Sequence, residues 1–255
     1  MLLHSKILGK GEPLLILHGY FGMGDNWKSL ANKFTEHFEV HLIDQRNHGR
    51  SFHSDDFNYE LLVDDLKEYI DHYKLGKVNL LGHSMGGKTV MLFAVSYPDK
   101  VKKLVVVDIA PKYYPPHHQF ILDALNAVDF DKISSRREVE SILKNYINEE
   151  GIRQFLLKNV YWKEKGKLAY RFNLDSLTEN NQEVGEALPP FTTFEGETLF
   201  LKGENSGYIT DEDFPLIEAH FPNSKIVVIK NSGHWLHAEN PTQFYEEVLN
   251  FLLDE

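Results

Sequence analysis

Short apolar runs alternate with helical periodicity along the first 110 residues of the chain. The runs are Leu14–Leu17, Val40–Ile43, Val78–Leu81 and Leu104–Val107, and the clearest helical pattern covers residues 59–73. Runs without regular polar alternation are typical of strands that are covered on both faces, which occur in parallel sheets. The alternation therefore predicts an α/β fold with a mostly parallel, doubly wound sheet.

The alternation breaks after residue 110. Residues 111–190 contain no comparable apolar run, and helical patterns cover 120–128, 137–148 and 151–158. Apolar runs resume at 198–201 and 226–229. We therefore expect a core domain made of residues 1–110 and 191–255. A helical cap, residues 111–190, is inserted in it before the last two strands.

The sequence Gly82-His83-Ser84-Met85-Gly86 joins an expected strand to an expected helix. In that context a Gly-x-Ser-x-Gly motif places its serine on a strained turn, with the hydroxyl group clear of both elements. Glycines two residues away on either side avoid a steric collision there. The N–H groups of the following helix point toward any anion that forms above the serine. These features favour Ser84 as a nucleophile over the alternative of a glycine-rich turn with an incidental serine.

A base and an acid are expected at the carboxyl ends of other strands. His234 follows the last expected strand, and its imidazole can take a proton from a serine near neutral pH. Asp108 ends the strand before the insertion and can orient that imidazole. Glu204 is the alternative acid, because it follows the first strand after the insertion. A Gly-x-x-Asp pattern in that segment would supply an aspartate as the acid. The sequence there is Gly203-Glu204-Asn205-Ser206, so a serine stands at the fourth position. The order serine, aspartate, histidine matches a hydrolase triad, and we prefer Asp108.

An oxyanion hole requires two N–H donors. One is expected from Met85, the residue after the nucleophile, and the other from the loop that follows His18-Gly19. Tyr20 is the preferred second donor, with Phe21 as the alternative.

Several aromatic residues are candidates for the walls of the substrate pocket. We expect Phe21, Tyr113, Phe155 and Trp235 to bind substrate, although Tyr113 and Phe155 could instead belong to the cap's own core. Trp235 could equally pack against the last helix.

Composition narrows the class of protein. The net charge of −11 argues against partners such as nucleic acid and anionic membranes. The absence of cysteine excludes disulfides and thiolate chemistry. The chain has no phosphate-binding loop and no dinucleotide fingerprint, and we expect neither a cofactor nor a metal. Without a signal-like N-terminal segment or an apolar run of about 18 residues, we expect a cytoplasmic protein, and its oligomeric state stays open.

These motifs resemble the α/β-hydrolase superfamily and, within it, the bacterial YbfF-type esterases. The resemblance extends over essentially the whole chain. It covers the His18-Gly19 loop, Asp44-x-Arg46-Asn47-His48-Gly49-x-Ser51, Gly82 to Lys88, Val107 to Pro111, Asn148 to Gly151, Gln154 to Lys158 and Gly233-His234-Trp235-x-His237-Ala238-Glu239. The resemblance implies a serine esterase with a helical cap that acts on short-chain esters and acyl-CoA thioesters. It also implies an acid after the strand before the cap, which is Asp108.

The expected function is therefore that of a serine carboxylesterase, which hydrolyses small or short-chain acyl esters through an acyl-enzyme. An acyl-CoA thioesterase with the same triad is an alternative. The acidic net charge disfavours it unless a basic rim from Lys88, Lys112 or Lys158 compensates. A receptor for small molecules that keeps the fold without turnover is a further alternative.

Overall fold

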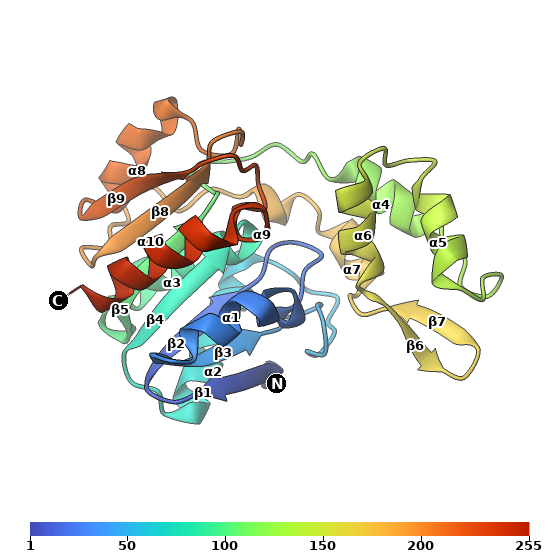
Figure 1. Ribbon diagram of the computed structural model, residues 1–255, viewed down its shortest axis with the longest axis horizontal. Helices are drawn as coiled ribbons and strands as arrows, with labels where there is room; N and C mark the ends of the chain where they lie inside the picture. The colour runs from blue at the N-terminus through green and yellow to red at the C-terminus, as the bar shows by residue number, and fades with distance from the viewer. Residues whose placement is uncertain (255) are drawn as a thin grey trace.

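The computed structural model describes residues 1–254, and its main feature is a seven-stranded sheet (Figure 1). The strand order is β1-β3-β2-β4-β5-β8-β9, and only β1 runs antiparallel to its neighbour. The strands are β1 (Ser5–Gly9), β2 (Glu12–Leu17), β3 (Phe38–Ile43), β4 (Val78–His83), β5 (Val101–Val107), β8 (Thr198–Gly203) and β9 (Ser224–Ile229). The fold class predicted from the alternating runs is confirmed.

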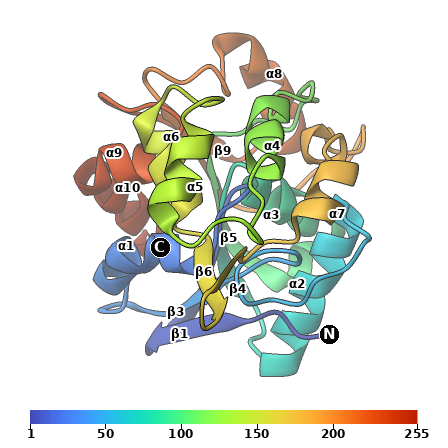
Figure 2. The ribbon, with the colours of Figure 1, turned by 90° about the vertical axis from the view of Figure 1, so that its right-hand side faces the viewer.

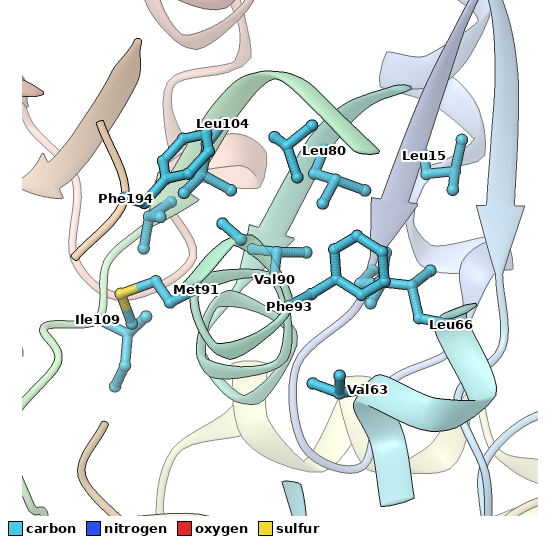
Figure 3. Packing of buried hydrophobic residues seen from close by; sticks show 14 of the residues in the cluster. Leu15, Val63, Leu66, Leu80, Val90, Met91, Phe93, Leu104, Ile109 and Phe194 are labelled. Carbon is cyan, nitrogen blue, oxygen red and sulfur yellow. The ribbon is translucent and has the colours of Figure 1, made fainter. Parts of the chain in front are cut away.

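Helices cover both faces of this sheet. They are α1 (Lys28–Phe34), α2 (Tyr59–Tyr73), α3 (Met85–Ser96), α8 (Phe214–His220), α9 (Leu236–Glu239) and α10 (Pro241–Leu253). Helices α2, α3 and α8 pack on one face, where Phe93 and Leu66 lie against the strand residue Leu80 (Figure 3). Helices α1 and α10 cover the other face through residues such as Phe34 and Phe244. The central strands are thus buried on both sides, which explains their lack of polar alternation.

The segment between β5 and β8 forms a separate lobe over the carboxyl edge of the sheet (Figures 1 and 2). It contains α4 (Gln119–Asn126), α5 (Arg136–Leu143), α6 (Glu150–Leu157) and α7 (Leu174–Glu179). It also contains an antiparallel hairpin of β6 (Val160–Glu164) and β7 (Lys167–Tyr170). The insertion is therefore not purely helical, which the sequence pattern did not reveal. The division into domains at residues 110 and 190 remains a prediction.

The boundaries of several elements differ from expectation. Strand β1 was not predicted; it pairs antiparallel with β3 at the edge of the sheet, where one face is only half-buried. A 3₁₀ turn, Gly24–Trp27, leads directly into α1. In residues 1–254, no helix combines the length and the apolar character that are needed to cross a bilayer.

Candidate active site

Ser84 lies between β4 and α3 with a strained backbone. Its φ of 53° and ψ of −116° are outside the regions that L-residues prefer. A methyl group on Gly82 would overlap the Gly86 carbonyl, and one on Gly86 would overlap the carbonyls of Leu17 and His18. The two glycines therefore allow α3 to start close against β4 and β2. This geometry is that of a nucleophile elbow, and it leaves Ser84 at the wall of a cavity.

His234 and Asp108 meet at the same edge of the sheet. The Asp108 amide bonds to the Leu201 carbonyl at 2.8 Å, so the β5–β8 ladder extends to the residue that bears the carboxylate. Asp108 is fully buried, and its Oδ2 lies 2.8 Å from His234 Nδ1. A carboxylate can only accept, so Nδ1 carries the proton in this contact and Nε2 is left as the basic nitrogen. His234 lines the cavity together with Ser84.

Ser206 and Glu204 take different places around this pair. Ser206 Oγ donates to Asp108 Oδ2 at 2.5 Å, and the Gly203 amide donates to Oδ1 at 3.0 Å. The Glu204 side chain is exposed, and its Oε2 accepts from the Asn231 amide at 2.7 Å. The structure thus places Asp108 beside the imidazole and turns Glu204 away. Ser206, the fourth residue of the Gly203–Ser206 segment, therefore hydrogen-bonds the Asp108 carboxylate. Only the tertiary structure reveals this contact.

The His234 ring is packed between other rings. Tyr208 stacks on it with centroids 3.9 Å apart and an angle of 16° between the planes. The His83 ring lies 4.7 Å away, and its Nε2 donates to the His234 carbonyl at 2.8 Å. Burial holds the pKa of His83 well below its usual value, so His83 is a neutral donor here. These contacts limit the orientations that the imidazole can take.

The backbone of the His18-Gly19 loop presents a free donor. Phe21 N donates to His48 Nε2 at 3.3 Å, whereas Tyr20 N and Met85 N have no acceptor within residues 1–254. Tyr20 and Phe21 both line the cavity, as does Ser84. The Tyr20 amide is therefore available to a ligand in the cavity, whereas the Phe21 amide is engaged.

Two neutral histidines support this loop. His18 Nε2 accepts from the Gln45 amide at 3.0 Å, and His48 Nε2 accepts from Phe21. Burial lowers the pKa of His18 to about 4 and that of His48 to about 3, which keeps both rings neutral acceptors near pH 7. The motif from Asp44 to Ser51 contains His48, but the sequence did not predict that His48 would contact the loop after His18-Gly19.

A cavity of about 680 Å³ opens above Ser84. It lies between the carboxyl edge of the sheet and the insertion, which contributes residues of the α4 and α6 regions. Phe21, Phe155 and Trp235 line it as expected, and the rings of Phe155 and Trp235 are 5.6 Å apart.

The expectation for Tyr113 is not met by the structure. Its side chain is 50% exposed and is absent from the cavity wall. His117, His118 and Phe120, slightly further along the same segment, line the cavity instead. His237 also lines it while stacking on Trp27 at 4.0 Å, so it both faces the pocket and packs against the core.

Comparison with known proteins agrees with this architecture. The family described as the alpha/beta hydrolase fold matches residues 12–145. The solved structure of a marine microorganism esterase is 46% identical, with a TM-score of 0.96, and the match covers 98% of this chain and 99% of that one. The sn-1-specific diacylglycerol lipase ABHD11 of Danio rerio is 38% identical over 96% of this chain and 80% of its own. Esterase YbfF of Escherichia coli is 34% identical over 95% of this chain and 94% of its own.

The chain belongs to the α/β-hydrolase family and is a serine hydrolase of that fold. Within the family it groups with the YbfF-type esterases, as its motifs predicted.

Proposed function

We propose that the protein is a serine carboxylesterase that hydrolyses small or short-chain acyl esters through an acyl-enzyme. The observation that carries the proposal is that Ser84, His234 and Tyr20 line one cavity while Asp108 is hydrogen-bonded to His234. The amides of Tyr20 and Met85 have no acceptor within residues 1–254. The names of the relatives described above, two esterases and a lipase, support the same class of reaction.

The reaction runs in two halves. His234 Nε2 takes the Ser84 proton while Oγ attacks the acyl carbon, and the resulting oxyanion accepts hydrogen bonds from Tyr20 N and Met85 N. Collapse of the intermediate breaks the ester C–O bond, and His234 gives its proton to the departing alcohol. Water, deprotonated by His234, then attacks the acyl-enzyme and releases the carboxylic acid with Ser84 regenerated. Asp108 stabilises the imidazolium in both halves.

The cap, residues 111–190, provides the roof of the cavity in this proposal. Phe120, Ile121, Ile152, Phe155 and Leu156 make that roof mainly apolar. A volume of about 680 Å³ lies within the range of roughly 300–1,000 Å³ that holds drug-sized ligands. The cavity can therefore hold an acyl chain longer than acetyl, and apolar acyl groups suit its roof.

The lysines that could favour an acyl-CoA are mostly engaged elsewhere. Lys88 Nζ is buried and donates to the Lys112 and Glu186 carbonyls. Lys112 Nζ pairs with Asp213 at 2.7 Å. Lys158 lines the cavity, but so does the acidic residue Glu239. The rim thus lacks the cluster of free cations that a polyanionic leaving group would prefer, which favours neutral esters.

Turnover of p-nitrophenyl esters, from acetate to decanoate, tests the proposal beside the acyl-CoA thioesters of matched length. We expect ester hydrolysis by the wild type, none above background by Ser84→Ala, and labelling by a fluorophosphonate probe in the wild type only. Equal labelling of both proteins would refute Ser84 as the nucleophile. Binding of esters without any turnover would instead identify a receptor, and a clear preference for thioesters would identify a thioesterase.

A further inference from the structure

The Tyr20–Phe21 loop packs into the inserted segment rather than into the sheet. Tyr20, Phe21 and Met85 belong to a hydrophobic cluster that consists mostly of apolar residues of the insertion, such as Leu122 and Leu156, and also includes Phe57, Tyr59 and Leu62. The cores on the two faces of the sheet are separate clusters that exclude them. The two residues whose amides are proposed to bind the oxyanion, Tyr20 and Met85, therefore pack mainly against the insertion.

The loop itself is a strained turn. Gly22 N donates to Gly19 O at 2.9 Å, which leaves Tyr20 and Phe21 as the two central residues. Phe21 has a φ of 58°, a left-handed conformation that glycine usually fills at this position. Turns of this kind persist only when the surroundings hold them in place.

Two hydrogen bonds from the insertion hold this turn. Asn159 Nδ2, from the connection between α6 and β6, donates to Phe21 O at 2.8 Å. Tyr20 Oη donates to the Leu177 carbonyl of α7 at 2.8 Å. His48 Nε2 accepts from Phe21 N on the side of the core. Phe21 is thus fixed at its amide by the core and at its carbonyl by the insertion.

Asn159 has a buried amide that is only half satisfied. The residue is fully buried, and its Oδ1 has no partner within residues 1–254. Because Phe21 O can only accept, the amide nitrogen must face the loop. A buried acceptor without a partner lowers stability, so an apolar residue would suit this place better if packing were all that mattered.

We infer that Asn159 is a positioning residue for the oxyanion hole, and that the insertion completes this hole as well as covering the pocket. The inference rests on the proposed function, since it assigns Tyr20 N as an oxyanion donor. Without the Asn159 bond, the Phe21 peptide can rotate and relax its left-handed backbone. The preceding Tyr20 N–H then no longer points at the position that the oxyanion takes.

The variant Asn159→Leu tests this role because it removes the donor and keeps the volume similar. We expect kcat on the best ester to fall about 10- to 100-fold, the loss typical of a misplaced catalytic group, with KM changed less than about threefold. A trifluoromethyl ketone analogue of the substrate, which forms an oxyanion on Ser84, should bind weaker by the same factor as kcat/KM falls. Affinity for the carboxylate product should stay the same.

Asn181→Leu is the matched control. Asn181 is also a buried asparagine of the insertion with an unpartnered Oδ1, but it has no hydrogen bond to residues 18–22. Its kinetic constants should match those of the wild type. A folded Asn159→Leu protein with unchanged kcat, or with the whole loss in KM, would overturn the positioning role.

If Asn159→Leu does not fold, Tyr20→Phe tests whether hydrogen bonds from the insertion position the oxyanion hole. It deletes the donor to Leu177 O, and we expect kcat to fall several-fold with the same parallel loss of affinity for the ketone. Unchanged kcat in this variant would overturn the inference. An active Ser84→Ala protein would instead refute the proposed function, so the two failures are distinguishable.

Discussion

At the scale of single residues, strain and hydrogen bonding converge on the same side chains. Ser84 and Asp108 both have positive φ values, 53° and 51°, at the ends of neighbouring strands. A positive φ is unfavourable for any residue with a Cβ atom. The strain persists at these two positions because the surrounding strands and hydrogen bonds hold the backbone in place. Asp108 then receives three donors, from His234, Ser206 and the Gly203 amide. This network fixes the orientation of the Asp108 carboxylate.

The prediction at this scale concerns Asp108 as the proposed acid of the triad. Asp108→Asn should lower kcat on the order of 10⁴-fold, because an amide at that position favours the wrong tautomer of His234. Steady-state kinetics on a p-nitrophenyl ester measures the loss. Glu204→Gln is the control of matched chemistry, and it should change kcat by less than about threefold, since its exposed carboxylate accepts a hydrogen bond from the Asn231 amide and not from His234. If Glu204→Gln had the larger effect, Asp108 would not be the acid.

At the scale of elements, close approach of helix α3 to the strands builds the elbow. Helix α3 starts at Met85, directly after Ser84, and packs on the sheet beside α2 (Figure 3). The approach depends on glycines at the contacts, because the β2 carbonyls lie where a side chain on Gly86 would be. The position of the Met85 amide is thus a consequence of helix packing.

Gly86→Ala should therefore damage both stability and activity. Its methyl group has to displace the Leu17 carbonyl or the helix start, at an overpacking cost of about 1–3 kcal/mol in the free energy of unfolding. Urea denaturation and ester turnover measure the two effects. Gly151→Ala is the control: nothing lies near its added methyl group, and alanine favours the helix α6, so its free energy of unfolding should stay equal or rise. If Gly86→Ala and Gly151→Ala had the same free energy of unfolding and the same ester turnover, close packing at Gly86 would not be what builds the elbow.

At the scale of the whole molecule, the loop after His18-Gly19 depends on histidines that are neutral in the folded protein. His18 and His48 are buried, with the pKa lowered by burial to about 4 and about 3. In the unfolded chain each has a pKa near 6.5. Between pH 6.5 and these folded values the unfolded state binds more protons, so the free energy of unfolding falls as the pH falls.

Each of these histidines should contribute a slope of up to about 1.4 kcal/mol per pH unit below about pH 6 and almost none above pH 7.5. Urea denaturation at pH 8, 7, 6 and 5 measures the slope. His48→Gln keeps an acceptor for Phe21 N but cannot titrate, so its slope between pH 6 and 5 should be shallower by about that amount. An unchanged slope would mean that His48 is protonated in the folded protein.

The sequence by itself determined the order of the buried strands and the main helices of the core, the elbow motif and the candidate triad, because periodicity and short motifs are local properties. It left Asp108 and Glu204 as alternatives, since both follow strands that end at one edge. Only the packing of the chain turned Glu204 toward Asn231, brought Ser206 to Asp108 and left Tyr113 outside the cavity. The edge strand β1 and the hairpin β6–β7 were missed because half-exposed strands lack a strong apolar run. The contact between Asn159 and Phe21 joins residues 138 positions apart, and such a contact exists only after the insertion has folded over the sheet.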